Sequence, residues 1–125
     1  MTVETSKVTT WLLAALAVLC NAGAQALIKQ ASHGVQVAGS ASTTWFGLQP
    51  LPLGMALLLY AVSFALTAWV YARMPLSVAS PLMAGAIFVL VSVASVAWFA
   101  EAMTALRVAG MVCILVGMVL LARSA

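Results

Sequence analysis

Three polar residues recur at intervals of four within an otherwise apolar stretch: Asn21, Gln25 and Lys29. Each step of four residues turns a helix by about 40° and advances it by about 6 Å, so the three side chains lie on one slowly winding face. The residues between Asn21 and Gln25 are all alanine or glycine, which lets another helix or a ligand approach closely. The spacing therefore predicts a polar helix face beside little steric bulk.

Two interpretations of this face remain open. In the first, Asn21 and Gln25 hydrogen-bond a neighbouring helix, and Lys29 extends its ammonium to lipid headgroups. In the second, the face lines a polar groove that leads from the membrane surface towards the bilayer centre. A lysine at the mouth of such a groove suits a phosphate or another anion.

The composition places these residues in a membrane. Of the 125 residues, 66% are hydrophobic and 6% are charged, and the mean hydropathy is +1.19. A soluble domain carries about a quarter charged residues. We therefore expect an all-α integral membrane protein, with no room for a separate soluble domain and with the first apolar run retained as a helix.

A bilayer core needs about 20 apolar residues per helix, and the chain supplies four such runs. We predict one four-helix transmembrane domain over residues 1–125, with spans at about 9–29, 52–72, 76–99 and 103–122. Residues 30–51 are rich in Gly, Ser, Thr and Gln and are predicted to form a loop, with a short interfacial turn around Trp45 and Phe46.

The basic residues do not form a patch. The net charge is +3, and the five basic residues stand singly near the predicted membrane edges, at Lys7, Lys29, Arg73, Arg107 and Arg123. This distribution excludes a nucleic-acid partner. Three of the five fall on the side of the N-terminus, which favours both termini in the cytoplasm.

Several kinds of chemistry lack their residues. No Asp or Glu occurs from residue 5 to residue 100, so no carboxylate is expected at the membrane centre for proton-coupled cation exchange. His33 is the one histidine, falls in the predicted loop and has no acidic neighbour. Cys20 and Cys113 lie in apolar segments without metal-ligand spacing. We expect no enzymatic activity, no metal and no cofactor.

Small and helix-breaking residues mark two further features. Pro81 and Gly85 stand four apart in the third span and predict a helix kink. Gly110 and Gly117 stand seven apart in the fourth span and share a face. That glycine face suits a dimer interface, with packing inside the monomer as the alternative.

Glu101 follows the third span, and Arg107 lies six residues further on, in the fourth. One interpretation is an interfacial pair that marks the membrane edge. The other is a charged gate that contacts a headgroup.

Four spans with the segments "LIKQAS", "MPLSVASPLMAG", "WFAEAMT" and "RVAGMVCILVGMVLL" resemble the small multidrug resistance class of the drug/metabolite transporter superfamily over nearly the whole chain. The cation exporters of that class have a glutamate where this chain has Asn21. Their aromatic pair in the third helix falls here at Ser80 and Met83. These departures remove the exporters' cation site.

The chain is more similar to the branch of the aminoarabinose flippase subunits ArnE and ArnF. That branch has a glutamine four residues before the lysine of its first helix, as Gln25 precedes Lys29. It also has a proline in the third helix, as at Pro81, and a glutamate at the connection to the fourth, as at Glu101. The resemblance implies a small multidrug resistance-like fold and a dimer in the bacterial inner membrane, formed by two copies or with a sister four-helix subunit.

The resemblance further implies a flippase, or flippase subunit, for undecaprenyl-phosphate-linked 4-amino-4-deoxy-L-arabinose or a similar lipid-linked sugar, with roles in lipid A modification and polymyxin resistance. The headgroup-binding residues expected on this basis are Asn21, Gln25, Lys29, Ser80, Glu101 and Arg107. Two alternatives remain open: a small exporter of cationic drugs or polyamines, and an accessory membrane subunit that does not itself transport.

Overall fold

The computed structural model describes residues 2–37 and 49–124, and it folds them into four helices. The helices are α1 (Thr2–Val37), α2 (Pro50–Tyr71), α3 (Leu76–Phe99) and α4 (Ala105–Ser124). Each of the four is long and apolar enough to cross a membrane. The predicted all-α architecture with four spans is confirmed, and it defines a multi-pass membrane protein.

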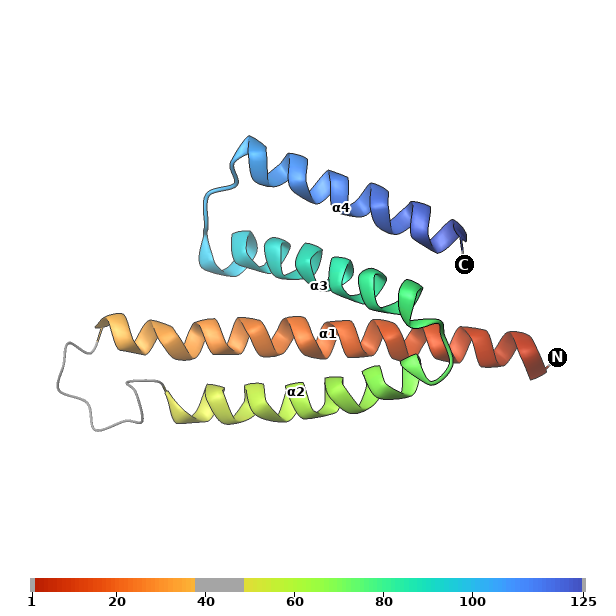
Figure 1. Ribbon diagram of the computed structural model, residues 1–125. Coiled ribbons are helices and arrows are strands. Elements are labelled where there is room, and N and C mark those ends of the chain that lie inside the picture. Colours follow the sequence, from red (N-terminus) through yellow and green to blue (C-terminus); the bar gives the residue numbers. More distant parts are fainter. Residues whose placement is uncertain (1, 38–48, 125) are drawn as a thin grey trace.

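The helices lie side by side in the spatial order α2, α1, α3, α4 (Figure 1). Helices that follow one another in the chain run antiparallel, whereas α1 and α3 run parallel. The two ends of the chain lie at one end of the molecule. The α3–α4 connection and the last turns of α1 lie at the other end, so Lys29, Glu101 and Arg107 share that end.

The bounds of α1, α2 and α4 differ from the predicted spans, with α1 beginning at Thr2 and α2 at Pro50. Helix α1 continues through residues 30–37, which were expected to begin the loop, so residue 33 is helical. Polar residues indicate where the chain leaves the apolar layer of the membrane, but they do not by themselves end a helix. No proline interrupts residues 30–37, so the helix continues through them. Trp45 and Phe46 lie outside the described residues.

Helix α4 begins at Ala105, two residues after the predicted start of the fourth span. Thr104 explains the boundary, because its hydroxyl oxygen accepts a hydrogen bond from the Arg107 backbone N–H at 3.3 Å. A threonine at this position satisfies a backbone donor that the first turn of a helix leaves free.

Small residues at intervals of seven join α1 to α2. The buried residues of this seam are Thr10, Ala17, Ala24 and Ala31 on α1, and Ala56, Ser63 and Val70 on α2. Ser63 donates a hydrogen bond to the Ala17 carbonyl at 2.9 Å, and the Gln49 N–H donates to the Ala31 carbonyl at 3.4 Å. These two contacts set one antiparallel register. Small side chains allow the two backbones to pack closely, which holds helices together where the hydrophobic effect cannot.

The other half of the molecule is more open. Helix α3 passes through Pro81 without interruption, and Gly85 is buried where α4 crosses it. A Cβ atom on Gly85 would lie 2.6 Å from the Met118 sulfur, so glycine is what allows this approach. No residue of the candidate span in α4 is buried. Helix α4 therefore rests on α3 with most of its surface uncovered.

Candidate functional site

A chain of hydrogen bonds connects the middle of α1 to α2. The Ser63 hydroxyl, which donates to the Ala17 carbonyl, also accepts from the Asn21 amide nitrogen at 3.5 Å. The Asn21 oxygen in turn accepts from the Gln25 nitrogen at 3.0 Å. Asn21 therefore faces α2 and joins the two helices, whereas Gln25 bonds Asn21 within α1.

Lys29, one turn further along α1, instead faces α3. Its ammonium forms an ion pair with Oε1 of Glu101 and lies 4.6 Å from the centre of the Phe99 ring. A cation over an aromatic face is held by the negative charge of the ring's π system. The turn of about 40° between successive residues of the polar face explains the change of partner, because it carries the face from α2 at Asn21 to α3 at Lys29.

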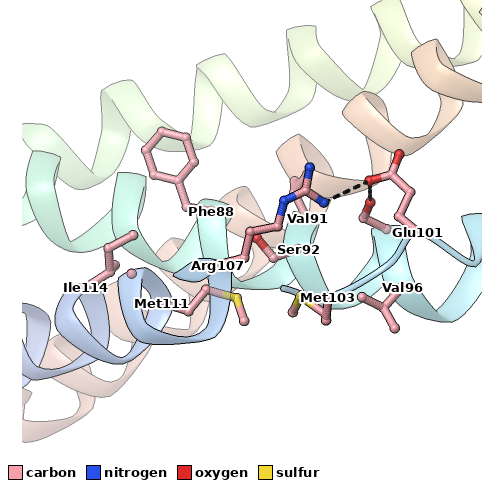
Figure 2. A pocket seen from close by; sticks show the side chains of 11 residues that line it. Phe88, Val91, Ser92, Val96, Glu101, Met103, Arg107, Met111 and Ile114 are labelled. Carbon is pink, nitrogen blue, oxygen red and sulfur yellow. Dashed lines mark hydrogen bonds and ion pairs between the residues drawn. The ribbon is translucent and has the colours of Figure 1, made fainter. Parts of the chain in front are cut away.

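Glu101 lies between three helices. While Oε1 contacts Lys29 on α1, Oε2 accepts a hydrogen bond from the Ser95 hydroxyl on α3 and lies 3.9 Å from the Arg107 guanidinium on α4. Figure 2 shows the Arg107 side chain extended towards the carboxylate. We call Lys29, Ser95, Glu101 and Arg107 the ionic cluster.

The end of α3 positions Glu101. Ala100 adopts the left-handed conformation with φ of 50°, and the backbone N–H groups of Ala100 and Glu101 both point to the Ser95 carbonyl. This arrangement closes the last turn of a helix and reverses the chain direction. The reversal places the Glu101 side chain beside the Ser95 hydroxyl.

A cavity of about 220 Å³ with a mixed polar and apolar lining adjoins the cluster between α1 and α3. Its lining includes Gln25 and Lys29 from α1, Ser95 and Phe99 from α3, and Glu101. Exposed fractions of 34% for the Lys29 side chain and 38% for that of Glu101 leave both groups accessible to a ligand.

A second cavity of about 530 Å³ lies next along α1 and α3, towards the end that carries the chain termini, and α4 contributes Leu115 and Met118 to its lining. Trp11, Val18, Leu82 and Leu90 are among its lining residues, all of which are apolar. We call the two cavities together the α1–α3 groove. The groove is apolar beside residues 11–19, whereas beside residues 22–29 its lining includes polar and charged side chains.

A third cavity of about 440 Å³ separates α3 from α4 (Figure 2). Arg107 and Glu101 lie at its polar end, and Phe88, Ile114 and Gly110 are among its apolar lining. Glu101 thus borders both this cavity and the polar end of the α1–α3 groove.

The structure brings four of the six expected headgroup residues together: Gln25, Lys29, Glu101 and Arg107. Asn21 adjoins them through Gln25. Ser80 does not join them, because it lies 15 residues before Ser95 on α3, about 22 Å along the helix.

Sequence reasoning missed Ser95 and Phe99. The sequence carries no local signal for Ser95, because it meets Glu101 only through the chain reversal at Ala100. For Phe99, the sequence indicates no more than an aromatic residue at a membrane edge, where such residues are common.

Comparisons with family models, with curated proteins and with solved structures give no match. The fold alone defines the class: a multi-pass membrane protein with four spans among the described residues.

Proposed function

We propose that this chain is a flippase, or a flippase subunit, that moves a lipid-linked sugar across the bacterial inner membrane. The observation that carries the proposal is the change in lining along the α1–α3 groove, from almost entirely apolar to a mixed lining that includes polar and charged side chains. A lipid with a phosphate-bearing headgroup changes in the same way along its length, from an apolar tail to a polar, charged headgroup.

Each end of the groove matches one part of such a lipid. The apolar cavity beside Trp11 and Leu82 suits a hydrocarbon tail. At the polar end, the Lys29 ammonium is positioned over Phe99 as a partner for phosphate, and the Gln25 amide offers a hydrogen bond to a sugar hydroxyl. The ionic cluster carries two cations and one carboxylate, so a singly charged phosphate would neutralise it.

The identity of the substrate rests on the resemblance to the aminoarabinose flippase subunits. On that basis the tail is undecaprenyl, and the sugar is 4-amino-4-deoxy-L-arabinose or a close relative. With both termini in the cytoplasm, the ionic cluster lies at the periplasmic edge of the membrane.

A dimer is part of the proposal. A Cβ added at Gly117 or Gly110 would meet no atom of a neighbouring helix within 4 Å, although Gly110 also borders the cavity between α3 and α4. An exposed stripe of small residues on α4 is suited to close contact with another helix, from a second copy or from a sister subunit.

Transport in proteoliposomes tests the function. The substrate is undecaprenyl phosphate bearing a fluorescent sugar, and a membrane-impermeant quencher reports how much of it reaches the outer leaflet. Lys29→Glu places a negative charge where phosphate binds, so we expect it to abolish transport at normal membrane insertion. Lys7→Glu is the matched control, because Lys7 is exposed at the other end of α1.

Each result has a distinct meaning. Loss of transport in Lys29→Glu alone supports the assignment. Unchanged transport in Lys29→Glu refutes the assignment. If that unchanged transport also requires a partner subunit, the result favours an accessory role for this chain. Uptake of organic cations by the wild type, with no lipid movement, favours the exporter.

A further inference from the structure

We propose that Glu101 is an internal counter-ion that an anionic headgroup displaces from Lys29. In the ligand-free protein, the carboxylate occupies the anion position at Lys29; when a phosphate group enters the α1–α3 groove, Glu101 shifts towards Arg107. This inference rests on the proposed function and adds to it an exchange of anions at the headgroup site.

The geometry of the carboxylate suits an exchange. Oε1 contacts Lys29, while Oε2 already lies 3.9 Å from Arg107. Loss of the Lys29 contact therefore leaves Glu101 close to a second cation on another helix. A carboxylate without such a partner would lose its ion pair when a ligand arrived, which would oppose binding.

The position of Glu101 in the chain leaves it room to shift. Residues 100–104 connect α3 to α4 and are not helical. Glu101 also borders a cavity on each side, with Lys29 beside one and Arg107 beside the other. Movement of the carboxylate between them requires no displacement of a packed helix.

Lys29 stays in place without Glu101 because a second contact holds it. Its ammonium lies 4.6 Å from the centre of the Phe99 ring, a contact that does not involve the carboxylate. The departing carboxylate thus leaves a positioned cation that a phosphate can pair with.

Arg107 is suited to receive the carboxylate. It is the most exposed member of the ionic cluster, at 61%, and its guanidinium also donates a hydrogen bond to the Ala102 carbonyl at 3.4 Å. That bond ties Arg107 to the same connection that carries Glu101. The exchange keeps each cation paired before and after the ligand binds.

A carbodiimide cross-link tests the exchange in the unaltered protein. The reagent joins an amine to a carboxylate only when the two are in contact, so we expect an amide between Lys29 and Glu101 in the purified protein, detected by peptide mass spectrometry. Undecaprenyl phosphate should suppress this cross-link, whereas the same amount of undecaprenol, which lacks the phosphate, should not. An unchanged cross-link yield with undecaprenyl phosphate bound would overturn the proposal.

Binding to variants provides a second measurement, by native mass spectrometry with undecaprenyl phosphate. Glu101→Gln removes the competing anion, so we expect binding about tenfold tighter than in the wild type. Lys29→Gln should weaken binding, and in its background Glu101→Gln should have little effect. Glu4→Gln controls for net charge, since Glu4 is the other acidic residue of the chain. Equal or weaker binding in Glu101→Gln would contradict the exchange.

Dioleoyl phosphatidic acid separates this proposal from the proposed function. If phosphatidic acid and undecaprenyl phosphate suppress the cross-link to the same extent, the exchange holds and selectivity for a polyprenyl lipid fails. If undecaprenyl phosphate binds without suppressing the cross-link, the exchange fails and the proposed function stands. If neither lipid binds, both are refuted.

Discussion

The hydroxyl of Ser63 on α2 lies 2.9 Å from the backbone carbonyl oxygen of Ala17 on α1 and donates a hydrogen bond to it. The same oxygen of Ser63 accepts from Asn21. One small side chain thereby satisfies its own polar atom and that of a neighbour inside the seam between two membrane helices. In an apolar layer a polar group without a partner is costly, so this pair of bonds fixes how α1 and α2 meet.

Ser63→Ala should destabilise the protein by about 1 kcal/mol, because it removes both hydrogen bonds and leaves the Asn21 amide nitrogen without that acceptor. Thermal unfolding in detergent measures the change. Ser77→Ala, on the exposed surface of α3, is the matched control and should have little effect. Equal midpoints for the two variants would show that the Ser63 bonds contribute nothing to stability.

Much of the fold follows from composition and length. Four apolar runs of about 20 residues can only become four spanning helices, and short connections make successive helices antiparallel. The seam between α1 and α2 has a sequence signal that was not predicted: Ala17, Ala24 and Ala31 repeat at intervals of seven, as do Ala56 and Ser63. Alanine is so common in membrane helices that either repeat alone is uninformative. The repeats of α1 and α2 become informative only when the two are compared.

The candidate site was predicted less completely. The polar face of α1 and the pair Glu101 and Arg107 were identified separately, but nothing in the sequence joined them. Their meeting depends on α1 and α3 lying parallel and adjacent, and on the left-handed turn at Ala100 that directs Glu101 back. Both are tertiary properties, and a non-glycine residue in that conformation has no reliable local signal.

Ala100→Gly should stabilise the protein, by up to about 1 kcal/mol, because the left-handed conformation at φ of 50° strains a residue with a Cβ atom and not glycine. Ala100→Val should lower stability, since a β-branched side chain fits that conformation least well. Unfolding midpoints of the two variants give the comparison. Ala102→Gly, in the same connection, controls for added backbone flexibility, and a stabilisation of equal size there would argue against strain at Ala100.

Gly117→Val should shift the purified protein from dimer towards monomer. Nothing lies within 4 Å of the position of a Cβ on Gly117, so valine fits within one copy and any effect arises between copies. Analytical ultracentrifugation in detergent measures the oligomer. Gly54→Val on α2 is the control, because that position is equally open. A Gly117→Val protein that keeps its oligomeric state would remove this face from the interface.

Gly85→Val should loosen the contact between α3 and α4, at a cost of about 1–3 kcal/mol, because the added carbons meet the Met118 side chain and Ile114. Met118→Ala vacates that space, so the double variant Gly85→Val with Met118→Ala should recover much of the loss. A double-mutant cycle of unfolding free energies in detergent measures this coupling.

The same cycle separates two roles for Gly85. If this glycine serves mainly to bend α3 with Pro81, as the sequence predicted, its replacement harms the helix itself, and the change at Met118 brings no recovery. If its role is to admit α4, the two substitutions compensate. A Cβ added at Gly85 would lie only 2.6 Å from the Met118 sulfur, which favours the second role and makes recovery in the double variant the expected result.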